Sequence, residues 1–167
     1  RLDKETSGCI IIAKNNTTHA ALSQLFSDRK IQKTYLAVVV GVPRQRKGTI
    51  NLPIGRHPIQ RFKMTTRRLP EGREAITDYE VLAKTPTHSL VACKPHTGRM
   101  HQIRVHLQNL GHPIAGDPLY GKREELNRHL LHAWKIEFHH PQSGELIVCE
   151  APLPKDFLLV VPWKPKT

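Results

Sequence analysis

The clearest hydrophobic pattern in the chain lies at residues 33–40, where apolar side chains occupy both faces of an expected β-strand. Positions 35, 37 and 39 share one face of such a strand, and positions 36, 38 and 40 share the other. A strand that is apolar on both faces is typical of the interior of a sheet that is covered on both sides. Gly41 and Pro43 end the pattern.

Other apolar runs predict further strands. An isoleucine-rich run at residues 9–13 suggests a short buried strand. Gln142, Ser143 and Gly144 separate two apolar runs and favour a hairpin turn between them. The remaining strands are expected at residues 48–52, 74–83, 89–94, 130–138 and 145–151.

Two segments show helical spacing. Capping residues at 15–18 precede apolar positions 21, 22, 25 and 26, which predicts a helix that runs to about residue 30. Thr97 is the expected N-cap of a second helix, in which apolar residues recur at positions 100, 103, 107 and 110. Gly111 and Pro113 are expected to end this helix. The chain after Pro162 is expected to be frayed.

The order of these elements indicates the fold class. Strands outnumber helices, and several neighbouring strands are joined by short turns, which predicts an α+β fold with a mixed, mostly antiparallel sheet and a few packed helices. The chain has 167 residues, a length typical of one domain. We therefore expect residues 1–167 to form a single domain.

Charge gives the first indication of function. Lysine and arginine number 26 and aspartate and glutamate 14, so the formal net charge is +12. This excess of positive charge is the electrostatic signature of a protein that binds a polyanion such as RNA. Aromatic residues make up 5% of the chain, which disfavours a broad stacking platform for single strands.

Residues 44–73 concentrate the positive charge. This proline-broken segment carries nine basic residues and one acidic residue. A solvated loop is the simpler interpretation of a charge run, but a one-signed excess favours contact with an RNA backbone. The side chains predicted to make it are Arg56, Arg61, Lys63, Arg67 and Arg68.

The cysteines and the hydropathy suggest a compartment. Cys9, Cys93 and Cys149 are odd in number and lack a short spacing, so a disulfide framework is not indicated. Each lies in or beside an apolar run, as buried reduced cysteines do. A reducing, cytoplasmic location follows, and the sequence contains no apolar run long enough for a membrane helix. A monomer is the default expectation.

Motifs for metals and cofactors are missing from the sequence. The chain has eleven histidines, but no Cys-x-x-Cys or His-Glu-x-x-His pair, which makes RNA contacts and structural hydrogen bonds the favoured roles over zinc. Phosphate-loop, dinucleotide-binding, nucleophile-elbow and zinc-deaminase motifs are also absent. An enzyme that acts on RNA would have to work here with side chains and no cofactor.

The side chains left as candidates are Asp3, Tyr35, Arg99 and Arg104. From spacing alone, Asp3 is better explained as a turn cap and Tyr35 as a core tyrosine. Arg99 suits a solvated side chain and a phosphate contact equally well. Arg104 lies close to the apolar face of its helix, where it would need an anionic partner if buried.

The residues around these candidates resemble the motifs of the RluA-type pseudouridine synthases, in the order expected for that family. The resemblance covers most of the chain and lies in Arg-Leu-Asp-Lys-Glu-Thr-Ser-Gly at 1–8, Lys-Thr-Tyr-Leu-Ala at 33–37, Thr-Gly-Arg-Met-His-Gln-Ile-Arg-Val-His at 97–106, Gly-His-Pro-Ile at 111–114, Gly-Asp-Pro-Leu-Tyr-Gly at 116–121 and Leu-His-Ala at 131–133.

The resemblance implies an enzyme that isomerises uridine in structured RNA, such as large-subunit ribosomal RNA. Asp3 would be the nucleophile, which attacks C6 of the uracil or C1′ of the ribose, and Tyr35 would stack on the base. Arg104 would pair with the catalytic carboxylate, and Leu131 would line the uracil pocket. Arg1 would help to fill the space left by the flipped nucleotide.

Two further expectations concern the RNA and the extent of the chain. The positive helix segment that carries Arg99 and His101 is expected to hold phosphates of the RNA. The family's first motif usually has a histidine and a strand before the arginine, so the chain resembles a catalytic domain that is truncated at its N-terminus. The competing interpretations are a non-catalytic RNA-binding domain on the same scaffold and a ribosome-associated structural protein.

Overall fold

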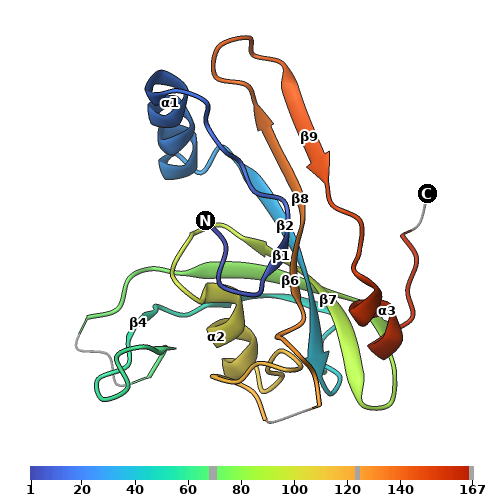
Figure 1. Cartoon of the computed structure of the whole chain (residues 1–167). Coiled ribbons are helices and arrows are strands. Elements are labelled where there is room, and N and C mark those ends of the chain that lie inside the picture. The colour runs from blue at the N-terminus through green and yellow to red at the C-terminus, as the bar shows by residue number, and fades with distance from the viewer. Residues whose placement is uncertain (68–70, 123–124, 166–167) are drawn as a thin grey trace.

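The computed structural model describes residues 1–67, 71–122 and 125–165. Its elements follow the chain in the order β1 (Ser7–Gly8), α1 (Asn16–Ser27), β2 (Gln32–Val40), β3 (Lys47–Asn51), β4 (Gly55–Arg56), β5 (Met64–Thr65), β6 (Ile76–Lys84), β7 (His88–Pro95), α2 (Gln102–Asn109), β8 (Leu131–His139), β9 (Leu146–Glu150) and α3 (Lys155–Val160) (Figure 1).

Over the described residues, one seven-stranded sheet organises the molecule in the order β1-β8-β2-β7-β6-β3, and β9 also pairs with β8. The β1 pairing with β8 is parallel, whereas β2, β3, β6, β7 and β9 pair antiparallel with their neighbours. β4 and β5 form a separate two-stranded hairpin. The predicted α+β class with a mixed, mostly antiparallel sheet is confirmed.

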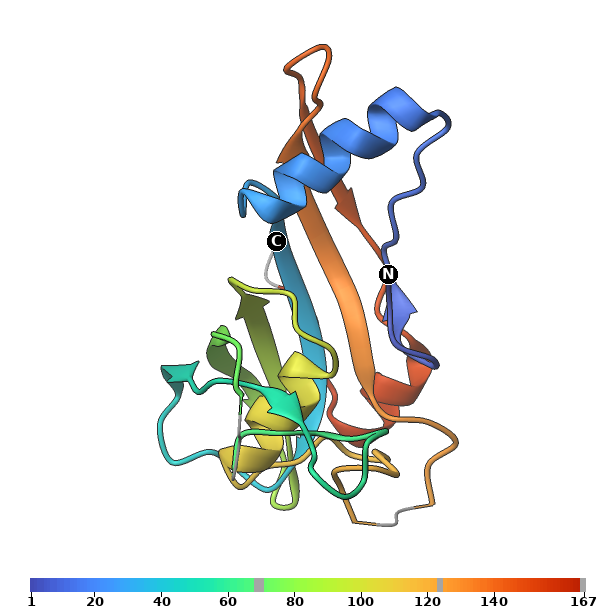
Figure 2. The ribbon, with the colours of Figure 1, turned by 90° about the vertical axis from the view of Figure 1, so that its left-hand side faces the viewer.

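Strand β2 lies in the middle of the sheet, as its doubly apolar pattern predicts. Ala37 and Val39 pack in one cluster with side chains of α2. Leu36 and Val38 pack in another cluster with Phe157 of α3. Helices α2 and α3 therefore cover opposite faces of the sheet (Figure 2).

Helix α1 has the local structure that the sequence predicts. The side chain of Asn15 accepts a hydrogen bond from the backbone N–H of Thr18 at 2.8 Å and caps the helix. Leu22 packs against Ile136 and Phe138 of β8, so that α1 lies beside the outer end of the β8–β9 hairpin (Figure 1).

Two elements differ from the prediction. Residues 9–13 do not form the expected buried strand: the strand is Ser7–Gly8, and Ile10 and Ile12 beyond it are exposed. The tail after Pro162, which was expected to be frayed, is packed at Trp163, whose ring lies edge-on against Trp134, while residues 166–167 lie outside the described residues. Helix α3, just before this tail, was not predicted. Within the described residues, no helix is both long and apolar enough to cross a lipid bilayer.

The cysteines are not all buried. Cys93 is fully buried, and burial raises the pKa of its thiol to about 12. Cys9 is half-buried and Cys149 on β9 is exposed. The prediction of burial is therefore wrong for Cys149, because β9 pairs with the edge of β8 and all its residues except Ile147 are exposed.

Candidate active site

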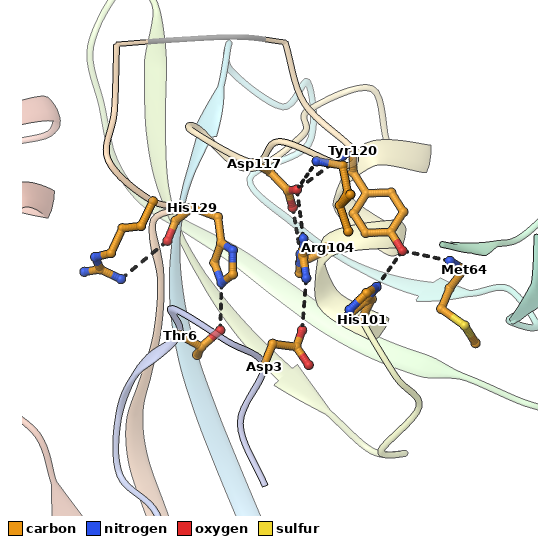
Figure 3. A network of polar contacts seen from close by, with 10 residues as sticks. Asp3, Thr6, Met64, His101, Arg104, Asp117, Tyr120 and His129 are labelled. Carbon is orange, nitrogen blue, oxygen red and sulfur yellow. Dashed lines mark hydrogen bonds and ion pairs between the residues drawn. The ribbon is translucent and has the colours of Figure 1, made fainter. Parts of the chain in front are cut away.

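The fold brings Asp3, Tyr35, Arg104 and Leu131 to one pocket of about 420 Å³. Asp3 precedes β1, Tyr35 lies on β2, Arg104 lies on α2 and Leu131 begins β8. Strands β1 and β2 flank β8, and α2 covers one face of the sheet, so residues that are far apart in the sequence meet beside the middle of the sheet. Figure 3 shows two of them, Asp3 and Arg104, facing each other.

The loop that carries Asp3 is fixed by buried histidines. Thr6 Oγ1 lies 2.8 Å from His129 Nε2, and Ser7 Oγ lies 2.8 Å from His132 Nδ1. Burial lowers the pKa of both imidazoles, so they are neutral near pH 7. The backbone N–H of Thr6 also donates to the Asp3 carbonyl at 3.0 Å, which closes the turn.

Arg104 is held by two carboxylates of unequal burial. Its Nε and Nη2 donate to Oδ2 and Oδ1 of Asp117 at 2.8 and 2.9 Å. Its Nη1 lies 3.4 Å from Asp3 Oδ2, and its guanidinium stands 5.1 Å from the ring centroid of Tyr120 (Figure 3). Asp117 is completely buried, whereas the Asp3 side chain is 27% exposed.

The pKa shifts of Arg104 and Asp117 show why both side chains stay charged although they are buried. Burial acts to lower the pKa of Arg104, but its hydrogen bonds and charge interaction with Asp117, together with Asp3, raise it above the ordinary value. Burial acts to raise the pKa of Asp117, but Arg104 and two backbone N–H groups hold it below the usual range. The buried pair is therefore fully charged near pH 7.

Tyr35 and Leu131 form the apolar part of the pocket. The pairing of β2 with β8 shifts register between Thr34 and Tyr35, a local irregularity of the kind that re-aims a side chain. Burial, and then the negative charge of Asp3, raise the pKa of the Tyr35 phenol. Leu131 is 4% exposed. Both side chains line the pocket and give it an apolar wall.

The start of α2 differs from the prediction. Thr97 is not its N-cap, because the helix begins at Gln102 and His101 occupies the cap position with a left-handed backbone, φ 56°. Thr97 Oγ1 instead donates to Gln102 Oε1 at 2.7 Å, and the buried Gln102 amide donates to the Ile76 carbonyl at 3.0 Å. The helix is thus attached to β6 by a buried polar network.

A second chain of hydrogen bonds reaches the pocket from the β4–β5 hairpin. The backbone N–H of Met64 donates to the Tyr120 hydroxyl at 2.8 Å, and that hydroxyl lies 2.7 Å from Nδ1 of His101 (Figure 3). Burial, followed by the charge of Arg104, lowers the pKa of His101. Burial raises the pKa of Tyr120 to about 12.

The predicted RNA contacts lie in two places. Arg1, Arg99 and His101 line the pocket, and Arg99 precedes α2 with its Nε donating to the Glu74 carbonyl at 2.9 Å. The others belong to the β4–β5 hairpin and the residues that follow it, and Arg68 lies outside the described residues. The described members of this group are Arg56, Arg61, Lys63 and Arg67.

Sequence reasoning assigned no role to Asp117, Gln102, Tyr120 or His129. Asp117 had a detectable signal, since a buried Arg104 requires an anion and Asp117 stands in a motif-like turn. Gln102 and Tyr120 also stand in motif segments, but their hydrogen bonds to distant residues could not be inferred from them, and His129 lies outside these motifs. Within the part of the chain that the structure describes, no group of three or more histidine, cysteine, aspartate or glutamate side chains is placed to hold a metal ion.

Comparison with known sequences indicates a relationship over most of the chain. A profile of the family described as RNA pseudouridylate synthase matches residues 1–109. The uncharacterized RNA pseudouridine synthase YhcT of Bacillus subtilis is 48% identical over 160 residues, which are 93% of this chain and 52% of that protein. Ribosomal large subunit pseudouridine synthase D of Nitrosomonas europaea is 42% identical over 166 residues, 93% of this chain and 47% of that protein. The chain spans about half the length of these relatives.

Comparison with solved structures gives the same relationship. Human RNA Pseudouridylate Synthase Domain Containing 1 matches with a TM-score of 0.82 and 31% identity, over 91% of this chain and 66% of that chain. Human RNA Pseudouridylate Synthase Domain Containing 4 matches with a TM-score of 0.78 and 29% identity, over 95% of this chain and 71% of that chain.

Proposed function

The chain belongs to the RNA pseudouridylate synthase family, and from that premise we propose that the protein isomerises uridine to pseudouridine in structured RNA, with Asp3 as the nucleophile. The observation that supports this most is the convergence of Asp3, Tyr35, Arg104 and Leu131 on one pocket from a loop, two strands and a helix. A domain that only binds RNA has no need of such a convergence.

The choice between the two carboxylates rests on their free lone pairs. Asp117 Oδ1 accepts from Arg104 Nη2 and from the backbone N–H groups of Leu119 and Tyr120, while Oδ2 accepts from Arg104 Nε. These bonds occupy Asp117, which is also fully buried. Asp3 accepts one longer bond from Arg104, at 3.4 Å, and faces the pocket. Asp3 is therefore the carboxylate that can attack a substrate.

The proposed reaction uses side chains throughout. Asp3 attacks C6 of the uracil or C1′ of the ribose, the N1–C1′ bond breaks, and the detached base turns within the pocket. A C5–C1′ bond then forms, and the bond to Asp3 breaks, either because C5 displaces the carboxylate from C1′ or because the carboxylate is eliminated from C6. The proton on C5 is removed and N1 gains one, so the product is an isomer of uridine. Tyr35 stacks on the base and is the candidate for the proton transfer at C5. Leu131 lines the pocket that holds the uracil. Arg104 orients the Asp3 carboxylate through its remaining N–H group.

A uridine within a helix cannot reach this pocket, so the target nucleotide has to be flipped out. Arg1 is placed at the pocket to help fill the vacated space, while Arg99 and His101 contact the RNA next to it. The basic side chains of the β4–β5 hairpin bind phosphates farther along the strand: Arg56, Arg61, Lys63 and Arg67. We propose ribosomal RNA of the large subunit as the substrate, because a relative with 42% identity carries that substrate in its name.

Replacement of the nucleophile tests the proposal. Asp3→Asn in the full-length protein should abolish pseudouridine formation in ribosomal RNA from a strain that lacks the gene, as measured by mass spectrometry of RNA fragments. RNA affinity should change little, since the phosphate contacts remain. Asp28→Asn is the matched control: Asp28 is an exposed carboxylate at the end of α1, and its replacement should leave turnover unchanged.

Three outcomes are distinguishable. If Asp3→Asn still forms pseudouridine, the assignment of the nucleophile is wrong. If the protein without substitutions binds RNA, with an affinity that falls steeply as the salt concentration rises, but converts no uridine, it is a non-catalytic RNA-binding domain. If it modifies another RNA and leaves the large-subunit RNA unchanged, the proposed substrate is wrong while the chemistry holds.

A further inference from the structure

The hydrogen bonds around Tyr120 determine the protonation pattern of His101. Tyr120 is 5% exposed, and its hydroxyl already accepts the backbone N–H of Met64 at 2.8 Å. The hydroxyl proton therefore needs an acceptor, and Nδ1 of His101 stands at 2.7 Å. If Nδ1 accepts this proton, the ring proton of a neutral imidazole has to reside on Nε2.

Within the described ranges, the other ring nitrogen of His101, Nε2, has no hydrogen-bond partner. His101 lines the same pocket as Asp3 and Arg104, and among the described residues no hydrogen bond to its Nε2 is recorded. The ring sits edge-on to Tyr120, with centroids 5.5 Å apart. Tyr120 thus occupies one edge of the imidazole, and the opposite edge is left for a ligand in the pocket (Figure 3).

The left-handed backbone of His101 indicates that its position matters. A non-glycine residue at φ 56° is strained, and this residue holds the cap position of α2 without using its side chain as a cap. The helix could begin at lower cost with a capping residue there. The conformation instead directs the imidazole between Tyr120 and the pocket.

We propose that His101 donates its Nε2 proton to an uncharged oxygen of the target nucleotide, and that Tyr120 is the positioning residue that holds His101 in this tautomer. This rests on the proposed function. A neutral donor suits a ribose oxygen or a uracil carbonyl, because Arg1, Arg99 and Arg104 already supply the positive charge at the pocket. The lowered pKa of His101 agrees with a neutral ring.

The tautomer can be measured without any substrate. Nitrogen-15 NMR of the full-length protein should show Nδ1 of His101 unprotonated and Nε2 protonated at pH 7. In Tyr120→Phe the fixed donor is lost, so the ring should populate both tautomers. Tyr79→Phe is the matched control, because Tyr79 is another buried tyrosine, 6% exposed, whereas the hydroxyl that bonds His101 belongs to Tyr120; the His101 signals should not change.

The kinetic arm measures what the donor contributes. His101→Leu should lower the rate of pseudouridine formation roughly tenfold, the contribution of about one neutral hydrogen bond. His101→Gln places an amide N–H near the position of Nε2 and should recover most of that rate. A target with a 2′-deoxy ribose separates the two acceptors: His101→Leu should have no further effect on it if the ribose hydroxyl is the acceptor, and its full effect if the uracil is.

The proposal is overturned if Nδ1 carries the proton in the unmodified protein, or if Tyr120→Phe leaves the ring signals and the rate unchanged. Equal loss of rate in His101→Gln and His101→Leu would also overturn it, since a purely packing role predicts no rescue by a donor. Absence of activity in the unmodified protein would refute the proposed function and with it the role of His101 as a donor to the nucleotide, while the NMR result would still decide the tautomer.

Discussion

Replacement of Asp117 by asparagine should destabilise the protein strongly, although Asp117 does not touch the substrate in the proposed reaction. Asp117→Asn keeps the shape of the side chain and an oxygen that can accept from the backbone N–H groups of Leu119 and Tyr120. It removes the negative charge and turns an N–H group toward the Nε–H of Arg104. The oxygen that remains can still accept from Arg104 Nη2. The buried positive charge of Arg104, which is 4% exposed, then keeps one carboxylate partner among the described residues, Asp3 at 3.4 Å.

The magnitude follows from burial. Removal of one partner from a buried ion pair costs about 3–5 kcal/mol, because the remaining charge stays desolvated. For a domain of this length, each kcal/mol lowers the melting temperature by about 2–4 °C. Asp117→Asn should therefore lower the melting temperature by roughly 6–20 °C. Urea unfolding should show the same loss as a lower midpoint with an unchanged slope.

The control is an ion pair of shorter distance and greater exposure. Arg29 and Glu74 lie 2.6 Å apart, closer than Arg104 and Asp117, but both side chains are about half exposed, at 50% and 56%. Exposed pairs contribute about 0.2–1 kcal/mol. Glu74→Gln should therefore cost less than about 1 kcal/mol in the same unfolding experiment.

Equal losses for Asp117→Asn and Glu74→Gln would refute the reasoning, because distance and not burial would then set the energy. A second variant checks the cause. Arg104→Met in the Asp117→Asn background removes the orphaned charge, so the double variant should unfold at a higher urea concentration than Asp117→Asn alone. A lower midpoint would mean that lost packing dominates.

The remaining predictions concern pH and backbone conformation. Burial lowers the pKa of His106 below its ordinary 6.5, so below that pH the unfolded chain binds more protons than the folded one. The free energy of unfolding should therefore fall as the pH drops from about 6.5. An unchanged free energy of unfolding in urea between pH 7 and 5 would contradict this. Gly8→Ala should destabilise the protein more than Gly144→Ala, as measured by melting temperature. Both glycines have positive φ, but a Cβ at Gly8 would lie 2.2 Å from the Ala133 carbonyl oxygen, whereas none of the described atoms lies within 4 Å of one at Gly144; similar losses would show that φ alone sets the cost.

The sequence predicts β2 well because its signal is local and redundant. Apolar side chains occupy both faces of the strand at 33–40. A strand of this kind is expected only inside a sheet that is covered on both sides. The same holds for the cap at Asn15, whose side chain bonds a backbone group three residues away. Such features depend on neighbours in the chain and can be read from them.

The partner of Arg104 could not be predicted in the same way. The requirement for an anion follows from the helix pattern, but the resemblance suggested Asp3, whereas the shorter bonds go to Asp117. Asp117 meets Arg104 because the turn after α2 folds back over that helix and its side chain binds Leu119 and Tyr120. This geometry depends on the tertiary fold and leaves no periodicity in the sequence.

The error at residues 9–13 has a different cause. An isoleucine run satisfies the pattern of a buried strand, but burial depends on what covers it. Cys9, Ile11 and Ala13 pack against the cluster around α1, while Ile10 and Ile12 remain exposed. Helix α3 was missed because it is six residues long and begins directly after Pro154, in a stretch too short for a helical period to be recognised.

The position of the proposed nucleophile depends on the far end of the chain. Arg128 forms a two-pronged ion pair with Asp156 of α3, at 2.8 and 3.1 Å, and the same guanidinium donates to the Glu5 carbonyl at 3.1 Å. Glu5 has a left-handed backbone, φ 71°, which the turn after Asp3 holds in place against strain. Helix α3 therefore stabilises the Asp3 loop without touching the pocket. The short motif that carries the nucleophile takes up the observed geometry through contacts with the last described helix and with β8. The motif alone therefore does not determine the site.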